Sequence, residues 1–184
     1  MSGIFVAVVG PSGVGKDSLL SYAREQLGDE MVLVRRIITR VAEESSEDHD
    51  SLTAEEFNVA AGLGQFSLHW NAHGMSYALP GSVGADLAAG RLVVANLSRA
   101  VLPMAAERFS RMVVVAVTAG PEVIAQRLFG RGRESAEEIR SRLNRSVDLL
   151  PGEAIEIDNS ETIDIAGDKF VSLLKTLLVA NELT

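Results

Sequence analysis

The sequence has no cysteine, only three lysines and few aromatic residues, which make up 5% of the chain. Without cysteine there is no disulfide, no thiol nucleophile and no thiolate ligand for a metal, and such a chain fits a reducing compartment. The first apolar run, Ile4–Val9, is too short for a signal peptide or a membrane span. These absences predict a cytoplasmic protein.

Basic residues are outnumbered, and they are unevenly divided between the two types. Lysine and arginine together number 17 against 25 acidic residues, so the net charge is -8. This balance argues against nucleic acid or an anionic membrane as a partner. All but three of the basic residues are arginines, whose planar guanidinium binds phosphate through two hydrogen bonds. We therefore expect a local phosphate site in an acidic protein.

Hydrophobic residues are abundant, at 47% of 184 residues, which predicts a single domain (1–184) with a sizeable core. Apolar runs that alternate with helical spacing predict an α/β fold with a parallel sheet covered on both faces. The expected strands are Ile4–Val9, Met31–Ile38, Leu92–Ala95, Met112–Thr118 and Ala154–Ile157.

Helix signals lie between these runs. Apolar side chains recur at helical spacing over residues 19–27 and again over 166–178, the expected closing helix. Thr53 and Glu56 form a capping box, as do Ser135 and Glu138, and Pro121 suits the first position of a helix. The stretch of about 37–90 is more polar and richer in glycine, and its strands are poorly defined. We interpret it as a small acceptor lobe inserted into a core of residues 1–36 and 91–184.

A glycine-rich loop joins the first strand to the first helix. It consists of Gly10, Pro11, Ser12, Gly13, Val14, Gly15 and Lys16. Glycines let the backbone amides point inward around a phosphate, the helix N-terminus adds positive potential, and the lysine reaches the β- and γ-phosphates. A turn that only reversed the chain would not explain the lysine. The loop therefore predicts a nucleotide-phosphate site.

The residue after this lysine departs from the usual pattern, in which a Ser or Thr hydroxyl binds magnesium. Here Asp17 takes that place and Ser18 follows. Because Mg²⁺ prefers carboxylate oxygens and water, Asp17 is the candidate metal ligand. The alternative is that Asp17 only favours the positive end of the helix dipole.

Two groups of arginines are candidate phosphate ligands. Arg131 and Arg133 lie in a glycine-containing loop of about 130–136, which we expect to be a lid, and Arg142 and Arg145 share a face of the next helix. A solvated basic face paired with nearby glutamates is the alternative. The other group, Arg35, Arg36 and Arg40, flanks the end of the second strand, where parallel sheets bind ligands. The alternative for this group is ordinary surface charge at a strand end.

In this order the motifs resemble the guanylate-kinase family of phosphate-loop kinases. The shared segments are GPSGVGK (10–16), TR (39–40), EEF (55–57), GQF (64–66), Trp70, HG (73–74) and RGRE (131–134). Within that family the chain is most similar to ribose 1,5-bisphosphate phosphokinases, through KDS (16–18), RRIITR (35–40), EDH (47–49), WNAHG (70–74) and NLSR (96–99). The resemblance implies a three-layer phosphate-loop fold with an inserted lobe and a lid. It also implies phosphorylation of the 1-phosphate of ribose 1,5-bisphosphate to 5-phosphoribosyl 1-diphosphate, in phosphonate catabolism.

The chain departs from guanylate kinases where a guanine nucleotide needs contacts. His69 replaces a glutamate that reads the guanine edge, His49 a tyrosine, Glu43 an acceptor-phosphate arginine, and Asn96 an acidic residue. A site that loses its base-reading hydrogen bonds loses discrimination by orders of magnitude, so GMP is not the expected acceptor. We expect the carboxylate near the metal to have moved from position 96 to Asp17.

The resemblance also implies roles for single residues. Lys16, Arg131, Arg142 and Arg145 act on the transferred group; residues 10–18, Arg133 and Asn159 bind ATP with Mg²⁺, with Asn159 at the adenine; and Arg36, Thr39, Arg40, Asp48, His49, His69, Tyr77 and Asn96 bind the phosphorylated sugar. Because the acceptor is already an anionic phosphate, no general base is needed. The alternatives are a guanylate or other nucleoside-monophosphate kinase and a non-catalytic binding module of this fold. The sequence leaves monomer and homodimer open.

Overall fold

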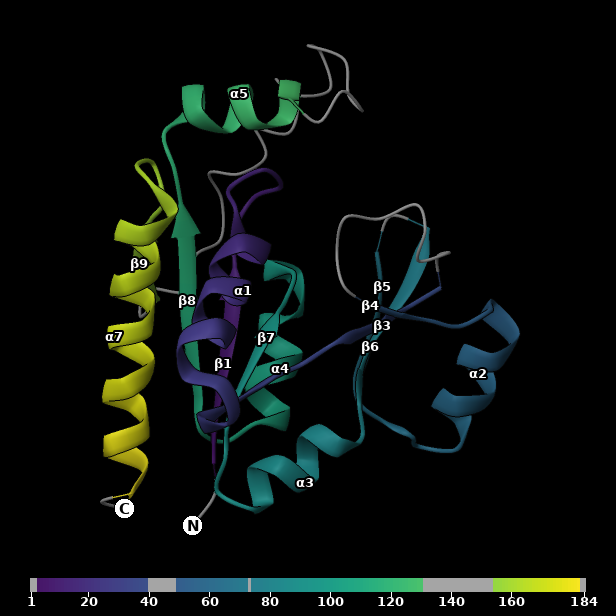
Figure 1. Cartoon of the computed structure of the whole chain (residues 1–184). Helices are drawn as coiled ribbons and strands as arrows, with labels where there is room; N and C mark the ends of the chain where they lie inside the picture. Colours follow the sequence, from purple (N-terminus) through teal and green to yellow (C-terminus); the bar gives the residue numbers. More distant parts are fainter. Residues whose placement is uncertain (1–2, 40–48, 73, 131–153, 183–184) are drawn as a thin grey trace.

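A computed structural model describes residues 3–39, 49–72, 74–130 and 154–182 (Figure 1). Its elements are β1 (Ile4–Val9), α1 (Lys16–Leu27), the 3-10 turn η1 (Gly28–Glu30), β2 (Met31–Leu33), β3 (Arg36–Ile38), β4 (His49–Ser51), α2 (Ala54–Gly62), β5 (Phe66–Ala72), β6 (Met75–Pro80), α3 (Ser82–Ala88), β7 (Leu92–Asn96), the 3-10 turn η3 (Arg99–Val101), α4 (Leu102–Arg108), β8 (Met112–Thr118), α5 (Pro121–Gly130), β9 (Ile155–Asp158) and α7 (Ile163–Glu182). Strands and helices alternate over most of this order, which confirms the predicted α/β class.

The main sheet has five parallel strands in the order β2-β7-β1-β8-β9. Its central strand, β1, is buried along its whole length. Side chains of a strand alternate between the two faces of a sheet, so β1 contributes to two cores. Val6 and Val8 face one core, and Phe5 and Ala7 face the other.

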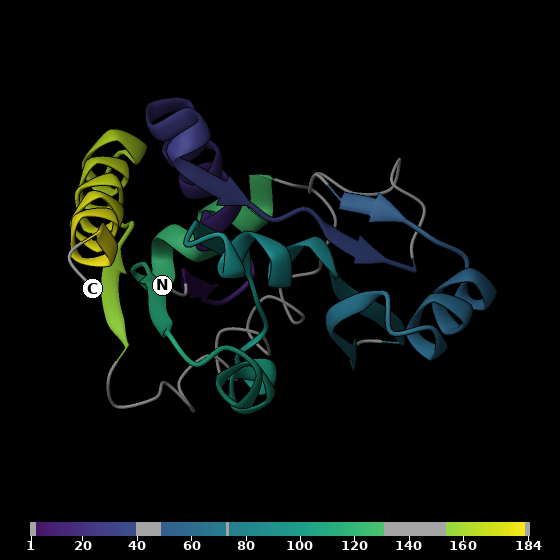
Figure 2. The ribbon, with the colours of Figure 1, turned by 90° about the horizontal axis from the view of Figure 1, so that it is seen from below.

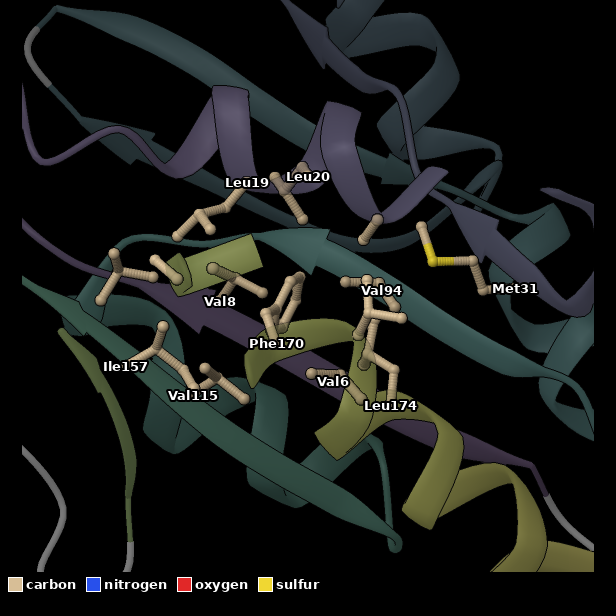
Figure 3. Packing of buried hydrophobic residues seen from close by; sticks show 14 of the residues in the cluster. Val6, Val8, Leu19, Leu20, Met31, Val94, Val115, Ile157, Phe170 and Leu174 are labelled. Carbon is tan, nitrogen blue, oxygen red and sulfur yellow. The ribbon is translucent and has the colours of Figure 1, made fainter. Parts of the chain in front are cut away.

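Helices cover both faces and complete the three layers. On one face, Leu19 and Leu20 of α1 and Phe170 and Leu174 of α7 pack against Val8 and the neighbouring strands (Figure 3). The opposite core includes residues of α3 and α4. Helix α5 lies beyond the carboxyl end of the sheet (Figure 1). Among the described helices, none is both long and apolar enough to span a membrane.

A second, four-stranded sheet lies beside the first, in the order β4-β3-β6-β5 (Figures 1 and 2). It is mixed, because β3 pairs with β4 in parallel and with β6 antiparallel. Helix α2 begins at the predicted capping box, with Thr53 accepting from the Glu56 amide and the Glu56 carboxylate accepting from the Thr53 amide. Apart from Arg36, the first residue of β3, this sheet lies within the segment of about 37–90 predicted as the acceptor lobe. The division into core, lobe and lid remains a prediction.

The expected single strand Met31–Ile38 is wrong. Strand β2 ends at Leu33, the amide of Val34 still donates to the Val94 carbonyl at 2.9 Å, and the chain then crosses to the second sheet as β3. One apolar run thus serves two sheets, because periodicity marks burial and does not identify the pairing partner. The closing helix begins at Ile163, earlier than the expected 166.

Strands β5 and β6 form an antiparallel hairpin that was not among the predicted elements. Apolar and polar residues alternate along β5, and Gly74, with φ 75, lies at the turn. That alternation with a glycine turn is the signal that could have found the hairpin.

Candidate active site

The phosphate loop lies at the carboxyl end of β1, between the ends of β7 and β8. The chain leaves β1 toward one face of the sheet, where α1 packs, and leaves the neighbouring β7 toward the other face, where α4 packs. Parallel sheets bind their ligands at such a point. Helix α1 begins at Lys16, directly after the loop. Its first amides therefore have no partners within the helix and can donate to an anion.

Two interactions shape the loop around this helix start. The Lys16 ammonium donates to the Gly10 carbonyl at 2.8 Å and to the Pro11 carbonyl at 3.0 Å. Gly15 precedes the helix with φ 94, a left-handed conformation that side chains other than glycine rarely adopt. A β-carbon on Gly15 would also lie 2.5 Å from the Asn159 amide nitrogen. The sequence position thus requires glycine for two independent reasons.

Asn159 and Arg127 support the loop from outside by donating to the same acceptor, the carbonyl of Val14. The distances are 2.8 Å from Asn159 Nδ2 and 3.2 Å from Arg127 Nη1. Sequence reasoning missed Arg127; its position near the end of α5, shortly before the arginine-rich segment, is the signal that could have marked it. Both side chains border a hollow of about 270 Å³, lined by Gly13, Gly15, Ser18, Arg127, Asn159 and Ile163.

Asn159 is held in place by the residues on either side. The Asp158 carboxylate accepts from the Ser160 hydroxyl at 2.6 Å and from the Ser160 amide at 2.9 Å, and the Gly120 amide donates to the Ser160 hydroxyl at 2.9 Å. The hydroxyl bond to the charged form holds the pKa of Asp158 below its ordinary value. This network ties the β9–α7 loop to the β8–α5 loop, so Asn159 has a rigid base.

Asn159 is 2% exposed, and no donor among the described residues lies within hydrogen-bond reach of its Oδ1. A buried amide oxygen without a donor is unfavourable unless a ligand supplies one. Asn159, which lines the hollow beside the phosphate loop, thus carries a buried amide oxygen without a donor among the described residues. The expected contact of Asn159 with adenine stays a prediction.

Asp17 and Asn96, which the sequence suggested as partners, are in contact. The amide nitrogen of Asn96 donates to Asp17 Oδ1 at 3.1 Å. Asp17 is in the first turn of α1, and Asn96 is the last residue of β7. Among the described residues no cluster of three or more His or acidic side chains could hold a metal alone. A single carboxylate beside a phosphate loop nevertheless fits Mg²⁺, which is commonly held by one or two carboxylates, phosphates and water.

In the second sheet, three side chains form a layered stack on one face. The Trp70 and Tyr77 rings are stacked with centroids 5.5 Å apart and an interplanar angle of 10°. The Arg36 guanidinium carbon lies 5.5 Å from the Tyr77 centroid. The parallel register pairs Arg36 with His49, which is only 3% exposed. The structure thus brings together three of the predicted acceptor residues, Arg36, Tyr77 and His49.

Other predicted acceptor residues lie elsewhere. His69 alternates with Trp70 along β5 and is exposed on the opposite face, with its ring 6.3 Å from Phe57 and 6.2 Å from Phe66. The structure therefore does not bring His69 to the stack, because neighbouring residues of a strand face opposite sides. Thr39 follows β3, and its hydroxyl oxygen accepts from the Ser76 amide at 2.9 Å.

Six predicted site residues lie outside the described residues, so the structure says nothing of them: Arg40, Asp48, Arg131, Arg133, Arg142 and Arg145. The same holds for the predicted lid and for the second capping box.

Comparison with known proteins gives close, nearly full-length relatives. The chain is 46% identical over 180 residues to "Ribose 1,5-bisphosphate phosphokinase PhnN" of Chelativorans sp. (strain BNC1), covering 94% of this chain and 85% of that protein. It is 48% identical over 176 residues to the protein of the same name from Burkholderia mallei (strain SAVP1), covering 94% and 95%. Among solved structures, guanylate kinase from Anaplasma phagocytophilum is similar with a TM-score of 0.64 at 17% identity, over 95% of this chain and 86% of that one. No family model matches the chain.

Proposed function

The chain belongs to the family of ribose 1,5-bisphosphate phosphokinases, and from this we propose that it transfers the γ-phosphoryl group of ATP to the 1-phosphate of ribose 1,5-bisphosphate. The products would be 5-phosphoribosyl 1-diphosphate and ADP. The observation that carries the proposal is the similarity to phosphokinases of this name over 94% of the chain. The phosphate loop, with its glycines and lysine, agrees with it.

On the donor side, the triphosphate would lie along the loop, with Lys16 leaving the Gly10 and Pro11 carbonyls to neutralise the β- and γ-phosphates. The base would then lie in the hollow beside the loop. Asn159 lines this hollow, and its Oδ1 has no donor among the described residues. Once the side chain turns this oxygen toward the base, the exocyclic amine of adenine could donate to it, whereas the carbonyl at the same position of guanine could not. This supports ATP over GTP as the phosphoryl donor.

The chemistry that Mg²⁺ would supply, when bound, is neutralisation of the charge that develops on the phosphates during transfer. Asp17 and Ser18 are the described side chains that would hold the metal or its water ligands, since both lie in the first turn of α1. The carboxylate is oriented by Asn96. No other step is assigned to the metal.

On the acceptor side, Arg36 and Arg40 would hold a phosphate of the sugar. Asp48 would bind a sugar hydroxyl, and Thr39 and His49 would contact the same substrate. The Tyr77 ring lies under the Arg36 guanidinium, 5.5 Å from its carbon, and orients the plane of that group. We assign His69 and Asn96 to contacts with the acceptor only as predictions from the resemblance.

The reaction itself needs positioning more than proton transfer. An oxygen of the 1-phosphate attacks the γ-phosphorus, and the bond to the β–γ bridging oxygen breaks as ADP leaves. The attacking oxygen is already anionic, so no residue has to remove a proton. Arg131, Arg133, Arg142 and Arg145 would close over the transferred group and exclude water that would otherwise hydrolyse ATP.

An acceptor screen with the purified chain tests this proposal. Release of ADP is measured with MgATP and either ribose 1,5-bisphosphate, GMP or AMP, and the sugar product is identified by mass. We expect turnover with the bisphosphate only, and none with the Lys16→Ala variant. Rapid turnover with GMP, with the bisphosphate ignored, would make the chain a guanylate kinase and overturn the proposal.

A further inference from the structure

The contact between Asp17 and Asn96 joins two elements far apart in the chain. Asn96 Nδ2 donates to Asp17 Oδ1 at 3.1 Å, and Asn96 is 9% exposed. Asp17 lies at the start of α1, directly after Lys16. An asparagine buried to this degree needs a partner for its amide, and the carboxylate of Asp17 is the acceptor that its Nδ2 finds.

The backbone around Asn96 is held firmly. Asn96 pairs with Val8 in the parallel ladder, and the Leu97 amide donates to the Val8 carbonyl at 2.9 Å. Asn96 thus lies at the carboxyl end of β7, beside the strand that leads into the phosphate loop. The Asn96 amide, on this rigid strand end, can fix the direction of the Asp17 carboxylate on α1. Without this hydrogen bond the Asp17 side chain would be free to change rotamer.

We propose that Asn96 is a positioning residue: it holds the Asp17 carboxylate in one orientation, with the remaining oxygen lone pairs presented to the metal that accompanies the nucleotide. This rests on the proposed kinase function, which supplies the nucleotide and its metal. It assigns Asn96 a role on the donor side of the site. Its expected contact with the acceptor is then not needed to explain why an amide occupies position 96.

The chemistry of the pair explains the amide. A carboxylate at position 96 would place two like charges about one hydrogen-bond length apart, and such pairs do not stay ionised together. A hydroxyl would be shorter, and an apolar residue would leave Asp17 without its donor. Asparagine is neutral, donates through Nδ2, and leaves the negative charge on α1 alone.

A double-mutant cycle on metal binding tests the proposal directly. The affinity of Mn²⁺ for the protein with a non-hydrolysable ATP analogue is measured by electron paramagnetic resonance for the wild type, Asn96→Ala, Asp17→Asn and the double variant. We expect Asn96→Ala to weaken Mn²⁺ binding by about tenfold, the order expected for a hydrogen bond to a charged group. In the Asp17→Asn background the same change should have no further effect.

Controls separate this from general damage. Binding of the analogue in EDTA should change less than about twofold in Asn96→Ala. Asn58→Ala, the same substitution at an exposed position of α2, should leave Mn²⁺ affinity at the wild-type value. A loss that is equal in both Asp17 backgrounds, or an increase in the KM for the sugar bisphosphate without a metal effect, would overturn the proposal.

A second pair of variants tests the contact without metal or substrate. Asn96→Asp should lower the melting temperature at neutral pH, because the two carboxylates repel each other. Adding Asp17→Asn restores one donor and one acceptor, so the swapped double variant should recover most of that loss. If Asn96→Asp costs the same with Asn at position 17, the contact does not orient the carboxylate and the inference fails.

These outcomes distinguish the inference from the proposed function. If the substitutions at positions 17 and 96 are coupled in their effect on Mn²⁺ affinity but ribose 1,5-bisphosphate is not phosphorylated, only the proposed acceptor is contradicted. If ribose 1,5-bisphosphate is phosphorylated but the two substitutions are not coupled, only the positioning role of Asn96 is contradicted.

Discussion

The Arg36 guanidinium lies over the Tyr77 ring, 5.5 Å from its centroid, and the same ring stacks on Trp70. The three residues come from β3, β6 and β5, so the second sheet itself builds the stack. A guanidinium placed over an aromatic face loses less freedom when it binds an anion, because its plane is already oriented.

Loss of the Tyr77 ring should therefore weaken binding of the sugar bisphosphate and leave ATP binding unchanged. We expect Tyr77→Leu to raise the KM for ribose 1,5-bisphosphate by a factor of about 3 to 5, the size of one exposed cation–π contact, with a smaller change in kcat. Tyr77→Phe keeps the aromatic face and should lose less. Steady-state kinetics at saturating MgATP measure both variants. Equal effects of Leu and Phe would mean that the hydroxyl matters and the ring does not.

Gly15 should be intolerant of even one added methyl group. Gly15→Ala combines a left-handed φ of 94 with a β-carbon 2.5 Å from Asn159 Nδ2. We expect a loss of stability of about 1 to 3 kcal/mol and a marked loss of ATP affinity, measured by urea unfolding and by calorimetry.

Gly62→Ala is the matched control for that change. Gly62 ends α2, and an added β-carbon there meets no atom within 4 Å. In a helix, alanine is favoured over glycine by up to about 1 kcal/mol, so this variant should be as stable as the wild type or more so. Wild-type ATP binding by Gly15→Ala would contradict the role given to the loop.

The side-chain amide of Asn159 should be required both for its hydrogen bond from Nδ2 to the Val14 carbonyl and for ATP binding. Asn159→Asp keeps the shape but sets a carboxylate against the Val14 carbonyl, which now accepts from Nδ2 at 2.8 Å. Two acceptors facing each other in a buried place repel, so we expect about 1 to 3 kcal/mol of destabilisation and weaker ATP binding. Asn159→Ala removes the bond without repulsion and should destabilise less. The reverse order of stabilities would show that this contact does not hold the loop.

Stability should depend on pH through Asp158. The Ser160 hydroxyl lowers the pKa of the Asp158 carboxyl in the folded protein. A lowered folded-state pKa contributes stability that is fully present above the unfolded pKa and is lost as pH falls through the folded value. Ser160→Ala should therefore be less stable than the wild type at neutral pH, and the difference should shrink as pH falls through that window.

Urea unfolding between about pH 3 and pH 7, the range that spans the ordinary pKa of aspartate, measures this difference, with NMR titration of the Asp158 carboxyl as a direct check. In Ser160→Ala the pKa of Asp158 should move back up. A stability difference that stays constant over the whole range would show that the serine acts without the carboxylate.

Local patterns in the sequence determined the fold class, the strand of the phosphate loop and the start of α2. These features depend on neighbours close in the chain: an apolar run for β1, glycines before Lys16, and a capping box at Thr53. The amphipathic α7 belongs to the same group, apart from its first turn. Such patterns can be read from the sequence without knowing which distant residues pack against them.

The tertiary structure alone decided which distant residues meet. The sequence does not show that Arg127 and Asn159 donate to the same carbonyl, that of Val14. The order of the strands in the sheet is what brings α5 and the end of β9 next to the phosphate loop. The sequence does not separate β2 from β3, because one apolar run can feed two sheets. Strand register likewise decided that Tyr77 faces Arg36 while His69 faces α2, since a shift by one residue turns every side chain to the other face.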